Sequence, residues 1–190
     1  MVVYRGKTKI AQYGQWDGYP AGQGRTVLEF LRSVNLDEFK KKVAKLKWLT
    51  KKQGEAIDAD PNWDKHYPYL SRDAGAEVLN AVMYGKMHVN DYPNKKKEIN
   101  VTVIGLVNRD GFAGDSLFCE WAYVIDLDNE VLEVYDGFNK KPLTEADRFR
   151  DLSKDNDYYP IKLVKSYPLS DLPTLDQMIK DCGPPENEEE

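Results

Sequence analysis

The sequence predicts an α+β fold, in which a mainly antiparallel sheet with a central β-hairpin carries packed helices. Apolar residues recur at helical spacing in several parts of the first half, whereas the second half holds β-branched and alternating runs. Asp128-Asn129 stands between two of those runs, as in a tight hairpin turn. Of the 190 residues, 41% are hydrophobic, which is enough for one core. We therefore expect a single globular domain over residues 1–183.

The first half is expected to begin with two extended segments, Val2–Tyr4 and Ile10–Trp16. The apolar residues between positions 27 and 34 recur at helical spacing and predict a helix that begins near Gly24. Asn35, with a glutamate three residues later, has the spacing of a capping box and predicts the start of a second helix.

The second helix is expected to turn a lysine-rich face to solvent. Its apolar residues form one stripe, and the lysines between positions 40 and 47 occupy the opposite face. Such a run suits contact with phosphate or RNA, but charged side chains normally occupy the face that the core does not use. We interpret it as a solvated face and expect no nucleic acid partner.

Two further segments complete the first half. Residues 58–73 are rich in aspartate, proline and aromatic residues, which indicates an ordered loop. Ser71 or Asp73 is placed to cap a third helix, and Gly85 is well placed to end it.

The second half is expected to supply the sheet. An apolar, β-branched run comes first, an alternating run then leads to the predicted turn, and a further segment returns antiparallel after it. Thr144, three residues before Asp147, predicts a short helix, and Thr174, three residues before Gln177, predicts a last one. The expected strands are Val101–Val107, Leu117–Leu127, Val131–Tyr135 and Ile161–Ser166.

Charge and cysteine content narrow the class of protein. The formal net charge is −5, and four of those charges are glutamates after residue 183, so the rest is close to neutral. Residues 184–190 are therefore expected to be a disordered acidic tail.

Cys119 and Cys182 are the two cysteines, too far apart for a Cys-x-x-Cys site, so we expect reduced thiols. No apolar run suits a signal peptide or a membrane span, and we expect a soluble, cytoplasmic protein that contacts no membrane.

Residues 12–24 form the most unusual segment of the chain. They read Gln-Tyr-Gly-Gln-Trp-Asp-Gly-Tyr-Pro-Ala-Gly-Gln-Gly. Glycine allows positive φ and close approach of backbones, while tryptophan and tyrosine offer large flat surfaces with one polar atom. The segment therefore predicts a shaped, semi-polar site.

Four motifs of the chain resemble an uncharacterised family of small proteins from fungi, bacteria and viruses. They are Tyr-Gly-Gln-Trp-Asp-Gly-Tyr-Pro at 13–20, Pro-Tyr-Leu-Ser-Arg-Asp at 68–73, Glu-Trp-Ala-Tyr-Val-Ile-Asp-Leu-Asp at 120–128 and Val-Tyr-Asp-Gly-Phe-Asn at 134–139. The resemblance covers most of the chain except the tail and implies no particular activity. More distant relatives read Cys-His before Trp-Asp-Gly-Tyr-Pro. Gly14 and Gln15 stand there in this chain, so the resemblance implies no cysteine chemistry at this site.

Several familiar sites are excluded by spacing. Residues 18–26 have one residue too many for a phosphate-binding P-loop, with Arg25 in place of its lysine, although a looser anion site at a helix N-terminus stays open. Residues 126–137 lack the glycine and the final glutamate of a calcium loop. His66 and His88 have no companions at metal-ligand spacing, and we interpret both as surface or loop residues. We expect no bound metal and no cofactor.

Two classes of function remain open. One is a binding domain, in which the Trp-Asp-Gly-Tyr-Pro turn contacts a small polar ligand or the side chains of a protein partner. The other is a metal-independent hydrolase or transferase, in which Asp17 works with Glu120 or Asp73 as acid and base. Structural roles for these carboxylates are the simpler interpretation, and since the sequence has no nucleophile motif and only two histidines, we favour binding. The candidate binding residues are Gln15, Trp16, Asp17, Tyr19, Arg25, Arg72, Asp73 and Glu120.

The composition of the tail generates a first prediction. Two prolines and four glutamates after Gly183 have no apolar side chain to add to a core. Truncation after Gly183 should therefore leave the melting temperature unchanged in a calorimetric scan. A loss of several degrees would show that the tail docks on the domain.

Overall fold

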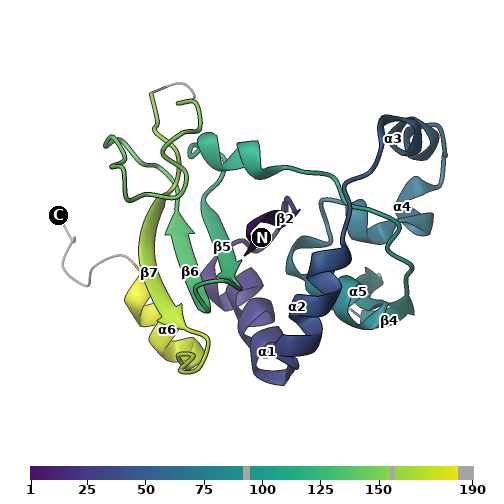
Figure 1. Cartoon of the computed structure of the whole chain (residues 1–190), viewed down its shortest axis with the longest axis horizontal. Helices are drawn as coiled ribbons and strands as arrows, with labels where there is room; N and C mark the ends of the chain where they lie inside the picture. The colour runs from purple at the N-terminus through teal and green to yellow at the C-terminus, as the bar shows by residue number, and fades with distance from the viewer. Residues whose placement is uncertain (92–94, 155–156, 184–190) are drawn as a thin grey trace.

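A five-stranded sheet forms the centre of the molecule, in the order β2-β1-β5-β6-β7 (Figure 1). The computed structural model describes residues 1–91, 95–154 and 157–183. Strand β1 runs parallel to β5, and the other neighbours in the sheet are antiparallel, so the predicted α+β fold is confirmed. The strands are β1 (Val2–Arg5), β2 (Lys7–Ala11), β5 (Trp121–Asp126), β6 (Val131–Asp136) and β7 (Lys162–Pro168).

The central hairpin joins β5 to β6 at the predicted turn. Asp126 ends β5, and its carboxylate accepts hydrogen bonds from the backbone N–H groups of Asp128 and Asn129, both at 3.0 Å. Glu130 takes a left-handed φ of 54° and returns the chain into β6. The hairpin is therefore set by a local Asx turn, which is why the sequence revealed it.

Both faces of the sheet are covered. Tyr123 and Ile125 of β5 belong to the main core, which the helices complete, while Ala122 and Val124 belong to a second apolar cluster on the opposite face. The second cluster is closed by the segment that contains Phe149 and Ile161. The helices are α1 (Arg25–Ser33), α2 (Leu36–Lys45), α3 (Lys51–Asp58), α4 (Trp63–His66), α5 (Val78–Tyr84) and α6 (Leu175–Cys182).

Local capping signals placed three helix ends, but the cap predicted at Ser71 or Asp73 is wrong, because α5 begins at Val78 without a side-chain cap. Asn35 accepts a hydrogen bond from the N–H of Glu38 at 3.0 Å and begins α2, and Thr174 accepts one from Gln177 at 3.1 Å and begins α6. Gly85 ends α5 with a φ of 67°. These three predictions are confirmed. The sequence could make them because each cap depends on groups that are only a few residues apart.

The strand predicted at Val101–Val107 is wrong. This segment is irregular and makes a single bridge, between Leu106 and Trp48, while the backbone N–H of Ile104 donates to the Tyr69 hydroxyl. The strands lie just before it, as a separate two-stranded hairpin whose apolar side chains pack against the main core. This hairpin consists of β3 (Lys86–Asp91) and β4 (Lys95–Asn100).

Other helices and strands also differ from the predicted ones. Helix α3 begins at an unpredicted capping box formed by Thr50 and Gln53. The helix predicted at Thr144 is only a turn, in which Asp147 accepts from the N–H of Thr144 at 2.7 Å. The second strand ends at Ala11, because the following residues belong to the glycine-rich loop. The predicted tail, 184–190, lies outside the described residues.

An arginine ties the second cluster to the central hairpin. Arg148 donates from Nε to Glu133 at 2.8 Å and also bonds the carboxylate of Asp126, which is 1% exposed. Its guanidinium lies 4.9 Å from the centre of the Tyr4 ring. Burial alone would raise the pKa of Asp126, but the hydrogen bonds from Asn129 and Arg148 outweigh it and hold that pKa below its ordinary value.

This ion pair generates a second prediction. The substitution Arg148→Met should lower the free energy of unfolding by about 3 kcal/mol, because it leaves a buried carboxylate without its cation. Since the Asp126 pKa is lowered in the folded state, its contribution is present above pH of about 4 and is lost as the pH falls further. Urea unfolding at neutral and acid pH should show a smaller acid loss in the variant.

The matched control is Arg150→Met. Arg150 forms an exposed pair with Asp151 at 3.7 Å, so its loss should change stability little. Equal effects of the two substitutions would contradict the structural role given to Arg148.

Candidate functional site

The glycine-rich loop, residues 12–24, is bonded to the segment that precedes α5. The backbone N–H of Gln15 donates to the carbonyl oxygen of Arg72 at 3.0 Å. The indole Nε1 of Trp16 donates to Asp73 Oδ1 at 2.9 Å. The structure therefore brings together two parts of the chain whose side chains were candidates from the sequence.

Inside the loop, the backbone makes an unusually tight turn. Asp17 takes a left-handed φ of 54°, which aspartate tolerates better than most residues. Its carbonyl oxygen accepts from the N–H of Gln23 at 2.7 Å. A Cβ on Gly22 would lie only 2.2 Å from that same oxygen, so a glycine is required there.

Two residues that the sequence did not single out hold the loop in place. The Gln23 amide donates to the carbonyl oxygen of Trp16 at 3.1 Å and accepts from the N–H of Ala76 at 2.7 Å. From β5, the Tyr123 hydroxyl donates to the carbonyl oxygen of Gly18 at 2.9 Å. Burial raises the pKa of Tyr123 well above its ordinary value, so this hydroxyl is a neutral donor. The loop is thus fixed to the sheet and to the segment before α5.

Two aromatic rings of this fixed loop, those of Trp16 and Tyr19, are largely exposed. Trp16 is 58% exposed and Tyr19 is 50% exposed. The Tyr19 hydroxyl donates to Asp17 Oδ1 at 3.2 Å. Each ring therefore has its polar atom bonded to a carboxylate, while much of its surface faces solvent.

The remaining candidate binding residues are less closely associated with this loop. Arg25 opens α1 and is exposed, and Arg72 and Glu120 are exposed as well. Among the residues that the structure describes, neither arginine forms an ion pair with Asp17 or Asp73, and Glu120 forms no ion pair. The side-chain oxygen of Gln15 is buried with no hydrogen-bond partner in the described part of the chain.

The backbone amides before α1 do not favour the anion site that the sequence left open at this helix N-terminus. The N–H groups of Gly22 and Gly24 donate to the carbonyl oxygen of Tyr19, at 2.9 and 3.5 Å. The third amide of this turn, on Gln23, donates to Asp17. These donors are already engaged within the loop, so they do not form a free cradle for phosphate.

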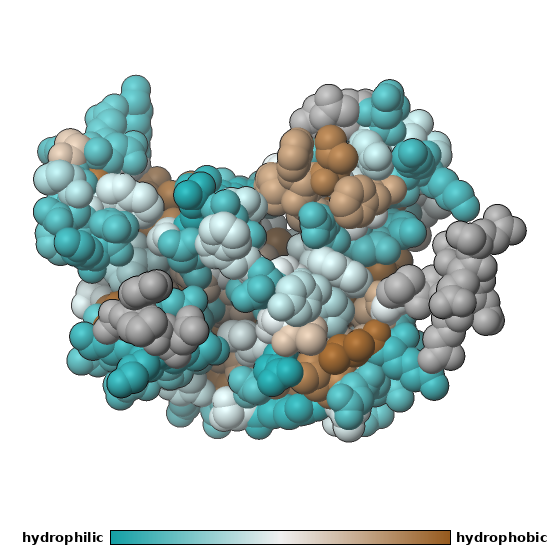
Figure 2. All heavy atoms as spheres, turned by 180° about the vertical axis from the view of Figure 1, so that it is seen from behind, coloured by the Kyte–Doolittle hydropathy of each residue, from teal (hydrophilic) through white to brown (hydrophobic). Residues whose placement is uncertain are grey.

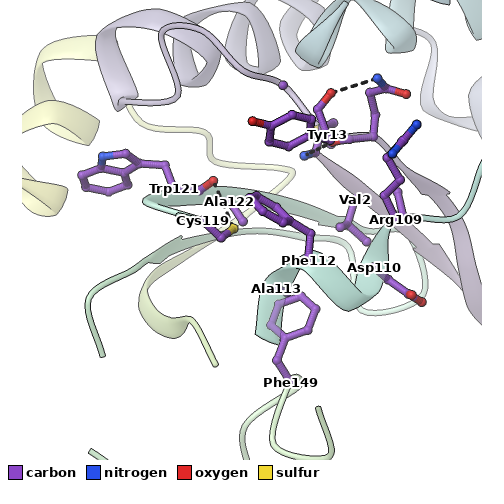
Figure 3. Close-up of a pocket in the computed structure, with 14 residues that line it drawn as sticks. Val2, Tyr13, Arg109, Asp110, Phe112, Ala113, Cys119, Trp121, Ala122 and Phe149 are labelled. Carbon is purple, nitrogen blue, oxygen red and sulfur yellow. Dashed lines mark hydrogen bonds between the residues drawn. The ribbon is translucent and has the colours of Figure 1, made fainter. Parts of the chain in front are cut away.

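A small cavity lies beside the loop (Figure 3). Its volume is about 50 Å³, and Tyr13 and Phe112 form part of its wall with their ring centres 4.7 Å apart. The Cys119 thiol also lines it, and burial raises the pKa of that thiol to about 11. A thiol with so high a pKa is a poor nucleophile at neutral pH. The cavity is far smaller than the roughly 300–1,000 Å³ of typical ligand pockets.

Comparisons with family models, curated proteins and solved structures gave no match for this chain. Among the helices that the structure describes, none is long and apolar enough to cross a bilayer. Within residues 1–91, 95–154 and 157–183, no three His, Cys, Asp or Glu side chains are grouped so that they could hold a metal ion. Both cysteines are free and buried.

The close contact at Gly22 generates a third prediction. Gly22→Ala should destabilise the protein by about 2 kcal/mol, because the backbone of Asp17 must shift to make room for the methyl group. It should also change the emission of Trp16, whose ring is positioned by this turn. Thermal melts and tryptophan fluorescence measure the two effects.

Gly54→Ala is the control for Gly22→Ala. Gly54 lies within α3, and a Cβ there meets nothing within 4 Å. Alanine favours a helix, so this variant should be about 0.5–1 kcal/mol more stable. A Gly22→Ala variant with unchanged stability and emission would show that the turn adapts easily.

Proposed function

We propose that this protein is a binding domain whose contact surface is built on the Trp16-Asp17-Gly18-Tyr19 turn. The observation that carries the proposal is the combination of two exposed aromatic rings with a tightly bonded backbone. Membership of the family that shares this turn is likewise a proposal.

Fixed, exposed aromatic residues suit recognition for a physical reason. Tryptophan and tyrosine contribute much of the affinity in protein interfaces, since they bury a large area and lose few rotatable bonds. The hydrogen bonds from Trp16 to Asp73 and from Tyr19 to Asp17 limit the rotation of both rings before a partner arrives. Less entropy is then lost when the complex forms.

The end of the sheet at which β5 begins and β6 ends offers more apolar surface. A Cβ on Gly18 would lie 3.7 Å from Trp121 Cβ, at the start of β5. Phe118 precedes that strand and is 68% exposed, and Phe138 follows β6 and is 55% exposed. In the rear view, apolar side chains gather in two patches on the side of the molecule that carries β7 and α6 (Figure 2). Exposed apolar surface of this kind supports a protein partner.

The shape of the site favours a partner's side chains over a small polar ligand. The cavity beside the loop holds only about 50 Å³, whereas the aromatic rings lie on the outer surface. The enzyme alternative needs a carboxyl group kept protonated by apolar surroundings. Asp17 and Asp73 are both exposed, and each accepts a hydrogen bond from an aromatic donor, so binding is the better supported proposal.

The test begins with a photo-crosslinking residue placed at position 16 in the cell that produces the protein. A partner captured there is then purified, and its affinity for wild-type and variant proteins is measured by calorimetry. Trp16→Ala should weaken the complex by about 30-fold, the loss of an interface anchor worth about 2 kcal/mol. The fold should be unaffected, because the ring is largely exposed.

Trp63→Ala is the matched control, because Trp63 lies on α4 and is 37% exposed. Its affinity for the purified partner should stay within about threefold of wild type. A partner that binds the Trp16→Ala protein as tightly as wild type would contradict the proposed surface.

A further inference from the structure

A second hollow lies between α5 and the β3–β4 hairpin, and its volume is about 430 Å³. That size lies within the roughly 300–1,000 Å³ of small-molecule sites. Helix α5 packs against β3, and Gly85 connects the two elements with a left-handed turn. The hollow is lined by Asn80, Tyr84, Lys86, Met87, His88 and Glu98.

A largely buried carboxylate orients the histidine of this hollow. The Glu77 side chain is 17% exposed, and its Oε2 accepts from the backbone N–H of His88 and from Asn80 Nδ2, both at 3.0 Å. Its Oε1 lies 3.3 Å from Nδ1 of the His88 ring. A carboxylate oxygen only accepts, so its closeness to Nδ1 favours the neutral tautomer that carries its proton on Nδ1. Nε2 is then left as an acceptor.

The charges in the hollow are balanced. Lys86 Nζ donates to Glu98 Oε1 at 2.9 Å, and the hydrogen bond from Lys86 lowers the pKa of Glu98. His88 lies directly opposite Glu98 across the hairpin. An ammonium group has three N–H donors, so Lys86 keeps donors for a ligand after it has bonded Glu98.

The hollow also has apolar walls. Tyr84 is 47% exposed at the end of α5, and the buried Met87 is also among the residues that line the hollow. Lys86 and His88 are two residues apart on one strand, so their side chains project from the same face of the hairpin. A ligand in the hollow would therefore meet the Lys86 ammonium group, the His88 ring and the Tyr84 ring.

We propose that this hollow is a second binding site, for a small, flat, uncharged molecule with an amide-like edge. An N–H group of the ligand donates to His88 Nε2, its carbonyl oxygen accepts from Lys86, and its ring contacts Tyr84. Lys86 and Glu98 are already paired with each other, so a charged ligand would meet a like charge on one of them, whereas an uncharged ligand would not. Nicotinamide and the nucleobase cytosine both carry this chemistry, and they are the two probes.

The experiment uses the full chain at pH of about 8, above the ordinary histidine pKa of about 6.5. Long-range ¹H–¹⁵N spectra of the ring should show His88 in the tautomer protonated at Nδ1. Glu77→Gln should change that pattern while the protein stays folded. A wild-type ring protonated at Nε2 would overturn the proposal, since no acceptor would face the ligand.

Each probe is then titrated while the His88 and Tyr84 signals are followed. At least one should bind saturably with a Kd near 1 mM, a usual affinity for so small a molecule. Nicotinate, which has the same ring but carries a carboxylate and no N–H on its side group, should bind at least about tenfold more weakly. The stronger of the two probes identifies whether a carboxamide ring or a nucleobase is preferred.

His88→Phe should abolish saturable binding, and His66→Phe is its matched control. His66 is also paired with a carboxylate, its Nδ1 lying 2.5 Å from Asp60 Oδ2, but its side chain is 61% exposed and does not line the hollow. The control should bind the probe as wild type does. Absence of a saturable shift with both probes up to about 10 mM, or equal binding by the His88→Phe protein, would overturn the proposal.

Discussion

The structure depends on the burial of strand β5 on both of its faces. Residues Ala122–Leu127 are all buried, so neither face of this strand can be left to solvent. One face is covered by the helices of the main core, and the other is covered by the segment around Phe149 and Ile161. Because that segment has little regular structure, it needs a specific polar attachment, and Arg148 provides it through Asp126 at the end of the same strand. Strand β5 therefore determines that both faces of the sheet are covered, and its end at Asp126 is the point at which the second cluster is attached.

The glycine-rich loop uses the other end of this strand. Tyr123 packs in the main core, yet its hydroxyl reaches the carbonyl oxygen of Gly18 and gives the loop a buried anchor. The loop backbone can then turn tightly through Asp17 while the rings of Trp16 and Tyr19 remain outside. Sheet burial thus supplies the rigidity, and the loop composition supplies the exposed surface. A flexible loop with the same residues would pay a larger entropy cost on binding.

Local signals in the sequence were enough for the elements that depend on near neighbours. The cap at Asn35, the turn at Asp126 and the left-handed Gly85 each involve groups a few residues apart. The β3–β4 hairpin was missed because Lys95–Lys97 resembles a solvated loop, and its strands are defined only by pairing with each other and packing on α5. The anchor from Tyr123 to Gly18 spans 105 residues, and no periodicity or motif marks such a contact. The sequence therefore located the unusual loop, while the interactions that fix it required the structure.

The two proposed sites are built by the same arrangement. In each, a carboxylate lies against a polar atom of a ring: Asp73 accepts from Trp16 Nε1, and Glu77 Oε1 lies 3.3 Å from Nδ1 of His88. Such pairs near the surface add little to stability, because solvent competes for the same groups. These pairs do orient the rings. Each pair leaves one ring face or one ring nitrogen free to contact a ligand or partner. Loss of Trp16 or of His88 should therefore reduce binding far more than stability, whereas loss of Arg148, whose partner is buried, should reduce stability first. This difference separates residues that hold the fold from residues that present the sites.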